Sequence, residues 1–156
     1  MGMFVNPDNS AFQRALNSKI YVDKTGLLEE LNAFIDTEQC CVCNSRPRRF
    51  GKSITANMLT AYYSRGCDSR ELFAGKKISE TRQFEEHLNK YDVIHLDVQW
   101  FYMDCGCAEN VVSHITRSVL SELKEEFPEV DFAESFSLGG MLARINQATG
   151  RKFMII

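Results

Sequence analysis

The stretch SRPRRFGKS, residues 45–53, decides how the fold of this chain is read. Phosphate-binding loops commonly follow the pattern G-x-x-x-x-G-K-[ST], and Gly51, Lys52 and Ser53 match its last three positions. Arg46 stands where the first glycine of the pattern belongs. From these residues alone, the stretch is either a nucleotide site with an altered entrance or a basic surface turn.

The flanking residues favour the nucleotide site. Residues 38–44, with the sequence EQCCVCN, are typical of a short buried strand, and residues 52–64 carry apolar side chains at helical spacing. A strand, a loop and a helix in this order form the setting that a phosphate-binding loop requires. The N–H groups of the loop would face an anion at the positive end of the helix. Lys52 would then reach the β- and γ-phosphates, and the Ser53 hydroxyl would coordinate Mg²⁺.

The rest of the chain predicts alternating helices and strands. Apolar spacing and the usual boundary residues predict helices over 25–34, 81–89, 111–127 and 138–149. Strand-like runs occupy 91–99 and 152–156. This alternation predicts an α/β fold, in which a parallel sheet has helices on both faces. Because an apolar run ends the chain abruptly, we read the chain as a fragment that stops inside such a domain, with its sheet incomplete at the C-terminus.

The composition excludes several other classes of protein. Of the 156 residues, 44% are apolar and 25% are charged, which is the balance of an ordinary globular domain. The net charge of -3 gives no overall attraction to nucleic acid. No run approaches the roughly 20 apolar residues that span a bilayer. No signal peptide is visible either, so we expect a cytoplasmic location and no membrane partner.

Cysteines occur at six positions without zinc-finger spacing, namely Cys40, Cys41, Cys43, Cys67, Cys105 and Cys107. The first three belong to the strand-like run, where reduced thiols are expected to be small buried groups. A cytoplasmic chain gives no reason to expect disulfides. We therefore interpret the cysteines as structural residues.

Four stretches carry a resemblance to a known family. They are YVDKTGLLEEL (21–31), SRPRRFGKS (45–53), AYYSRGCDSRELFAGKKI (61–78) and KYDVIHLD (90–97). Together they resemble the AAA-ATPase-like family of bacterial proteins, over nearly all of the chain from about Asn6. In that family R-P-R-R-F-G-K-S stands in place of the ordinary loop, so Arg46 departs from the general pattern and not from the family's.

The resemblance implies a P-loop NTPase-like fold that binds Mg-ATP. The implied nucleotide-binding residues are Arg48, Arg49, Phe50, Gly51, Lys52 and Ser53, with Ser53 as a ligand of Mg²⁺. The acidic Walker B pair is expected directly after the KFMII strand, beyond Ile156. A PD-(D/E)XK nuclease-like domain often follows in the family, and this chain lacks both parts. We therefore expect ATP hydrolysis by the full-length protein and little by this chain alone.

The same resemblance implies a division of the chain. Residues 1–37 are read as an N-terminal segment with a helix, and residues 38–156 as a partial P-loop NTPase core. The strand before the loop is expected to lie beside the terminal strand. Two other functions stay open: a regulatory module that binds nucleotide without hydrolysis, and binding of nucleic-acid backbone through Arg46, Arg48 and Arg49, which would weaken steeply with salt. The oligomeric state also stays open.

Few other residues suggest chemistry. Asp97 ends the run VIHLD and is the one candidate in the chain for a catalytic or metal-binding acid, unless it is a strand-end residue bonded to the backbone. Tyr21, Asp23, Lys24 and Thr25 match the family's N-terminal motif. They either line the adenine or ribose side or cap the next helix. The residues read as structural or as solvated surface are His87, His95, His114, Glu122, Lys124, Glu125 and Glu126.

Overall fold

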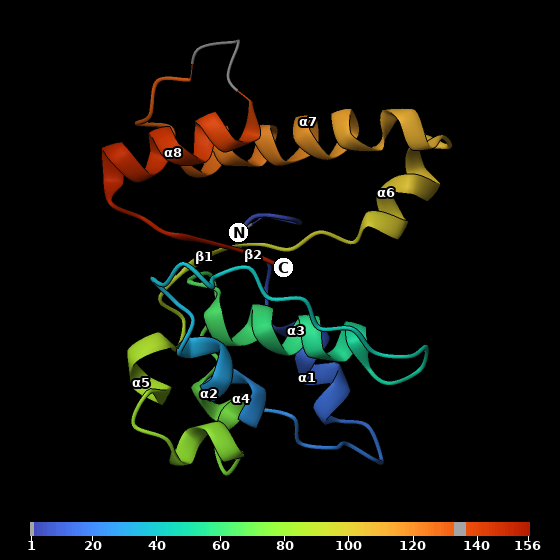
Figure 1. Cartoon of the computed structure of the whole chain (residues 1–156), viewed down its shortest axis with the longest axis vertical. Coiled ribbons are helices and arrows are strands. Elements are labelled where there is room, and N and C mark those ends of the chain that lie inside the picture. Colours follow the sequence, from blue (N-terminus) through green and yellow to red (C-terminus); the bar gives the residue numbers. More distant parts are fainter. Residues whose placement is uncertain (1, 133–136) are drawn as a thin grey trace. The chain divides into compact units, whose positions relative to one another are not determined.

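The computed structural model describes residues 2–132 and 137–156, and Figure 1 shows the order of its elements. The chain forms two compact units. The first, here named the loop unit, is the continuous piece Asp8–Lys90. The second, named the strand unit, is discontinuous because it combines Met1–Pro7 with Tyr91–Ile156.

The loop unit is built mainly of helices, in the order α1 (Ser10–Leu16), α2 (Gly26–Asn32), α3 (Lys52–Tyr63), α4 (Arg70–Phe73), the 3-10 helix η1 (Lys77–Glu80) and α5 (Phe84–His87). Its core is aromatic: the rings of Phe12 and Phe73 stack at 5.2 Å, and Tyr62 meets Phe73 edge-on at 5.4 Å. All three side chains are fully buried. Each aromatic pair contributes roughly 0.5–1.5 kcal/mol beyond the burial of its area, so these rings fix α3 within the unit.

Asn89 terminates α3 from a distance in sequence. Its side-chain amide donates hydrogen bonds to the carbonyl oxygens of Ala61 (3.0 Å) and Ser64 (2.8 Å), and its backbone N–H donates to the Tyr62 oxygen at 2.7 Å. The last carbonyls of a helix lack partners within the helix, and these donors supply them. Asn89 has a φ of 56°, a left-handed conformation that asparagine tolerates better than most residues.

The strand unit contains β1 (Asp92–Ile94), α6 (Val98–Cys105), α7 (Ala108–Glu126), α8 (Leu138–Thr149) and β2 (Phe153–Ile155). The strands β1 and β2 are parallel, with Asp92 opposite Phe153 and Ile94 opposite Ile155. Val5 forms an antiparallel bridge with Ile94. Because parallel neighbours need a long connection, the helices α6 to α8 lie between the two strands in the chain. The predicted α/β character and parallel strand direction are thereby confirmed.

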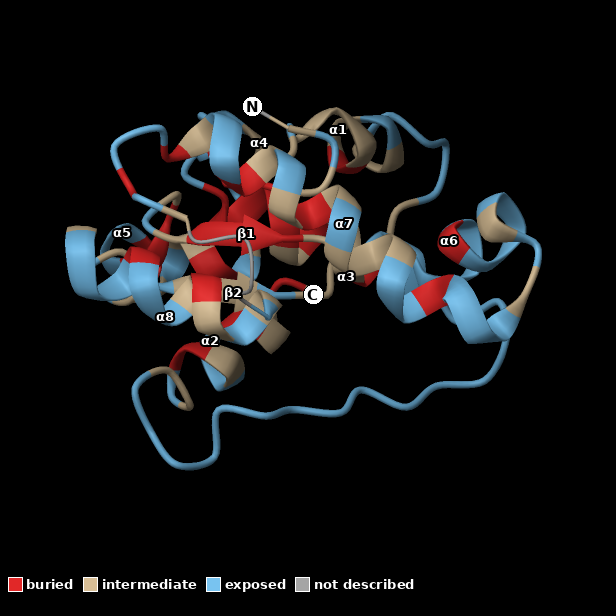
Figure 2. Cartoon of the chain, turned by 90° about the horizontal axis from the view of Figure 1, so that it is seen from above, coloured by how far each residue is buried: buried red, intermediate tan, exposed pale blue. Residues whose placement is uncertain are grey.

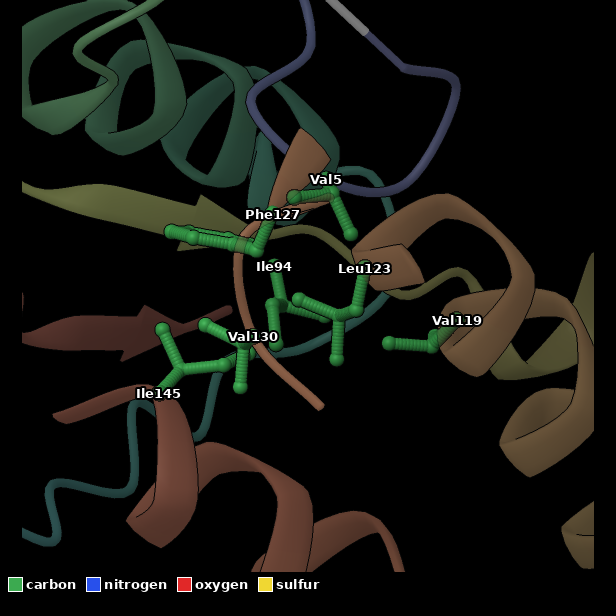
Figure 3. Close-up of a cluster of buried hydrophobic side chains, with 7 residues drawn as sticks. All are labelled: Val5, Ile94, Val119, Leu123, Phe127, Val130 and Ile145. Atoms are coloured by element: carbon green, nitrogen blue, oxygen red, sulfur yellow. The ribbon is translucent and has the colours of Figure 1, made fainter. Parts of the chain in front are cut away.

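One apolar cluster holds the strand unit together. Figure 3 shows its seven buried side chains, which come from the N-terminal segment, β1, α7, the turn after α7, and α8: Val5, Ile94, Val119, Leu123, Phe127, Val130 and Ile145. Burying one such side chain stabilises the fold by about 1.5–3 kcal/mol. The cluster therefore accounts for the predicted amphipathic pattern of α7.

The N-terminal segment is attached to α7 by a carboxylate. Glu122 accepts hydrogen bonds from the backbone N–H groups of Met3 (2.9 Å), Phe4 (2.8 Å) and Val5 (2.7 Å). The interpretation of Glu122 as a solvated residue was therefore wrong. A carboxylate that accepts several backbone N–H bonds forms strong, charge-assisted contacts. This side chain consequently fixes the segment that brings Val5 into the core.

A buried ion pair joins β1 to the turn after α8. Asp92 is fully buried, and the guanidinium of Arg151 binds both of its carboxylate oxygens, with Nε at 2.7 Å from Oδ2. Asn6 donates to the same carboxylate at 2.8 Å and accepts from the Val93 N–H at 2.9 Å. Removing one partner of such a pair commonly costs about 3–5 kcal/mol, because the other charge stays buried. Asp92, Arg151 and Asn6 thus set the position of β1.

Two sequence-based expectations about strands were wrong. Residues 38–44 lie in the described part of the chain but form no strand, and residues 36–50 are exposed throughout, as the pale blue trace in Figure 2 shows. Cys40, Cys41 and Cys43 are therefore exposed instead of buried, and the two-stranded sheet of the described residues consists of β1 and β2 alone. The predicted strand 91–99 is shorter, because α6 begins at Val98.

The predicted helices agree better with the structure. The expected helix 52–64 is α3, and the expected helix 138–149 is α8. The Ser137 hydroxyl caps α8 by accepting a hydrogen bond from the Gly140 N–H at 3.2 Å, and Gly150 ends it with a φ of 70°. Among the described residues, no helix has the length and apolar character that a membrane span requires.

Candidate functional site

The candidate site is the stretch 45–53 at the start of α3, in the loop unit. Gly51 is the N-cap residue of this helix and has a φ of 77°, in the left-handed region. A Cβ atom at this position would lie 3.1 Å from the Lys24 Nζ atom. Both facts favour glycine, because it alone adopts this conformation without a steric cost. The predicted helix start at Lys52 is therefore confirmed, and Gly51 creates it.

Lys52 folds back over the loop. Its Nζ atom donates a hydrogen bond to the carbonyl oxygen of Arg46 at 2.8 Å. Arg46 is the residue at the position of the missing first glycine, so the two ends of the loop pattern are in direct contact. The bond uses a backbone carbonyl, which any residue provides. The replacement of glycine by arginine is thus compatible with a closed loop.

A second lysine reaches the loop from a distant part of the chain. The Lys24 Nζ atom donates to the carbonyl oxygen of Phe50 at 2.8 Å. The sequence motif around Lys24 suggested a role near the nucleotide, but no spacing rule predicted this contact. The structure therefore brings the 21–25 motif and the 45–53 loop together.

The residues beside Lys24 anchor it. Asp23 accepts hydrogen bonds from the backbone N–H groups of Thr25 (2.9 Å) and Lys77 (3.1 Å), and the Thr25 hydroxyl accepts from the Ile78 N–H at 3.3 Å. Burial opposes ionisation of Asp23, but these backbone hydrogen bonds outweigh it and lower its pKa. The motif is thus fixed to η1 on one side while Lys24 contacts the loop on the other.

Tyr21 belongs to this support and not to acid–base chemistry. Burial, with a smaller contribution from the charge of Asp23, raises the pKa of Tyr21 to about 12. The phenol therefore stays protonated at neutral pH. Its ring packs edge-on against Phe12 at 6.1 Å, and the Lys76 ammonium lies 5.8 Å from the ring centre.

The surface of the loop is cationic and open. Arg46, Arg48 and Arg49 are exposed, and Phe50 is 58% exposed. Within the described residues, no carboxylate forms an ion pair with Lys24 or Lys52. The first turn of α3 contains no acidic residue. Because a helix N-terminus carries partial positive charge, loop and helix together present a site for an anion.

A bound Mg²⁺ fits this site only in company with a ligand. Among the described residues, no group of three His, Cys, Asp or Glu side chains is placed to hold a metal ion. The Ser53 hydroxyl is one exposed oxygen in the first turn of α3. Mg²⁺ commonly keeps several waters and uses one or two protein oxygens together with substrate phosphates. The donor set agrees with a metal ion that arrives with the phosphates.

Asp97 lies in the strand unit and caps α6. Its carboxylate accepts hydrogen bonds from the N–H groups of Gln99 (3.0 Å) and Trp100 (3.2 Å). The structure therefore shows the backbone-bonding role that was the alternative for this residue. A role in metal binding stays a prediction.

The histidines contribute no further site. His114 has a carboxylate partner that the sequence did not reveal, because its Nε2 atom lies 2.7 Å from the Asp104 carboxylate on α6. Burial lowers the pKa of His87 and of His95, so both favour the neutral form. Their burial and lowered pKa values agree with the interpretation of His87 and His95 as structural residues.

Comparison with known proteins gives one result for nearly the whole chain. A family model, AAA-ATPase-like, with the description "Predicted AAA-ATPase", matches residues 10–156. The match includes both the 21–25 motif and the 45–53 loop. No match was found among curated proteins or among solved structures.

Proposed function

The chain belongs to the AAA-ATPase-like family, and from this premise we propose that its 45–53 loop binds the phosphates of Mg-ATP. Membership of the family carries a general ATPase-like role. The proposal adds the place of binding and the residues that carry it. These are Arg48, Arg49, Phe50, Gly51, Lys52 and Ser53, within a P-loop NTPase-like fold.

The observation that carries the proposal is the closed loop at the start of α3. Lys52 contacts the Arg46 carbonyl at 2.8 Å, and Gly51 turns the backbone into the helix with a φ of 77°. The loop thus combines the backbone N–H groups at the start of the helix with the Lys52 ammonium group, which no carboxylate in the described residues neutralises. This combination suits a polyphosphate, which needs several donors and positive charge in one place.

Each residue of the loop has a distinct part in binding. Lys52 supplies charge to the phosphates, and Gly51 lets the backbone approach them closely. Arg48 and Arg49 are exposed guanidinium groups, which suit forked contacts to phosphate or stacking on a base. The Ser53 hydroxyl is the protein oxygen for Mg²⁺. When bound, the metal ion would neutralise charge on the phosphates.

The test is a titration of the chain with Mg-ATP in a calorimeter. Lys52→Ala removes a charged hydrogen-bond donor, and we expect it to weaken binding by about ten- to a hundredfold. Arg46→Ala should have a smaller effect, since Lys52 uses the backbone of Arg46 and not its side chain. Lys90→Ala, at an exposed lysine outside the loop, is the control.

The same titration separates the alternatives. Equal ATP affinity for the unaltered chain and for Lys52→Ala would reject the assignment. Binding to single-stranded DNA that falls steeply with salt and is indifferent to Mg-ATP would instead favour contact with nucleic-acid backbone. If the full-length protein binds Mg-ATP but releases no phosphate, the result would favour a regulatory module that binds nucleotide without hydrolysis.

A further inference from the structure

We propose that Lys24 is a second phosphate-binding lysine, which contacts the same ligand as Lys52. This inference rests on the proposed function, because it adds a residue to that site. Lys24 lies far from the loop pattern in the sequence, yet its Nζ atom donates to the Phe50 carbonyl at 2.8 Å. The loop is therefore held by one ammonium group near each end, Lys52 at Arg46 and Lys24 at Phe50.

The place of the Lys24 ammonium is the first argument. It lies 3.1 Å from where a Cβ atom of Gly51 would be, so it touches bare backbone at the residue that begins α3. Phosphate oxygens that bind the N–H groups at this helix start must approach the same backbone. An ammonium group at that position can share the ligand without a large movement.

The donor count of the ammonium group is the second argument. A lysine ammonium carries three N–H donors, and the Phe50 carbonyl uses one from Lys24. Within the part of the chain that the structure describes, no carboxylate pairs with this lysine. Its charge and two remaining donors are available to an anion. Lys52 likewise uses one of its three N–H donors for a backbone carbonyl, that of Arg46.

The rigidity of the support is the third argument. Asp23 and Thr25, on either side of Lys24, are bonded to the backbone of η1 at 3.1 and 3.3 Å. The half-buried Lys24 side chain therefore starts from a fixed backbone. Ordering a free surface lysine on binding costs side-chain entropy. Lys24 is already restricted by its hydrogen bond to Phe50, so it loses less entropy when a ligand binds. Lys19, which is exposed in the same segment, has no such support and provides a matched comparison.

The experiment compares four variants by calorimetry with Mg²⁺ and a non-hydrolysable ATP analogue, adenosine 5′-(β,γ-imido)triphosphate. Lys24→Met keeps most of the apolar stem and removes the charge, and we expect binding to weaken about tenfold. Lys24→Gln can still donate to the Phe50 carbonyl but is neutral, and it should be as weak as Lys24→Met. Lys24→Arg keeps the charge and should recover most of the affinity. Lys19→Met should bind like the unaltered chain.

The outcomes separate this inference from the proposed function. If Lys24→Gln binds the analogue as tightly as the unaltered chain does, Lys24 only stabilises the loop conformation through the Phe50 carbonyl, and the inference is overturned. Affinity of Lys24→Met equal to that of Lys19→Met overturns it as well, while loss of binding in Lys52→Ala would still support the proposed site. No binding of the analogue by the unaltered chain overturns both. Thermal unfolding of each variant, followed by circular dichroism, identifies any variant that fails to fold.

Discussion

Asp97 illustrates how a single carboxylate can carry two different explanations. It follows β1, where an acid that binds a metal would be expected, but its oxygens accept the N–H groups of Gln99 and Trp100 at the start of α6. Helix caps of this kind contribute about 0.5–2 kcal/mol to stability. The capping role alone is sufficient to account for an aspartate at this position.

Substitution of Asp97 separates the two roles. Asparagine caps a helix as well as aspartate but carries no charge. We expect Asp97→Ala to lower the free energy of unfolding by about 1 kcal/mol and Asp97→Asn to change it little. Urea denaturation measures both values. If Asp97→Asn keeps the stability but loses Mg-ATP binding, the carboxylate has a role beyond the cap.

The contacts of single residues show which parts of the candidate site could be predicted from the sequence and which could not. Gly51 and Lys52 were predictable, since they belong to a local pattern whose geometry follows from neighbouring residues. Lys24 contacts Phe50, and Asn89 contacts the end of α3, across long separations in the chain. Such contacts depend on tertiary packing, and no local spacing encodes them. The same holds for the Arg151–Asp92 pair.

At the level of elements, the helices α3, α7 and α8 were predictable, whereas α1, α4 and α6 were not predicted and the strand expected over 38–44 is absent from the described residues. Helices α7 and α8 satisfy their own backbone hydrogen bonds, so periodicity and caps suffice to locate them. A strand needs a neighbour, and the apolar run 38–44 has none in the structure. Residues 98–105 form α6 although their aromatic and branched residues favour a strand, because Asp97 caps the start and Gly106, with a φ of 72°, ends it.

The exposed segment before α3 predicts a pattern of proteolysis. Residues 36–50 are exposed throughout, and Arg48 and Arg49 lie within them. We expect trypsin to cut first after these two arginines, while the Arg46–Pro47 bond resists because proline follows. Exposed, weakly held segments are the usual first sites of cleavage. Mass spectrometry of a short digestion identifies the cuts.

Ligand dependence makes this digestion a test of the loop. If Mg-ATP binds Arg48 and Arg49, it should slow cleavage after both. Cleavage after the exposed Lys19 is the internal reference, since that lysine lies outside the loop. Equal protection at Lys19 and at the loop would point to a general effect of the ligand and not to binding at 45–53.

For the whole molecule, the histidines predict how stability depends on pH. Burial lowers the pKa of His95 from its usual 6.5, although the charge of Asp97 opposes this, and burial also lowers the pKa of His87. Below pH 6.5 these two histidines therefore bind more protons in the unfolded chain than in the folded chain, so their contribution makes stability rise with pH in this window. The neutral His87 and His95 side chains make their full contribution to the free energy of unfolding above about pH 6.5. This contribution is lost as the pH falls through the pKa values of the two histidines in the folded chain.

Urea denaturation at about pH 7.5 and pH 5.5 measures this dependence, with the lower free energy of unfolding expected at the acidic value. His95→Gln and His87→Gln should each reduce the difference between the two conditions. A pH dependence that neither substitution alters would show that other groups cause it.

The discontinuity of the strand unit has a consequence for biosynthesis. The segment Met1–Pro7 is translated before the loop unit, Asp8–Lys90, whereas its partners Glu122, Asp92 and Ile94 are translated after that unit. All residues of the loop unit are present before residues 91–156 are made, whereas residues 2–7 lack their partners until then. For this segment the order of translation therefore differs from the order of assembly, because its partners and the parallel strands β1 and β2 all come after the loop unit in the chain.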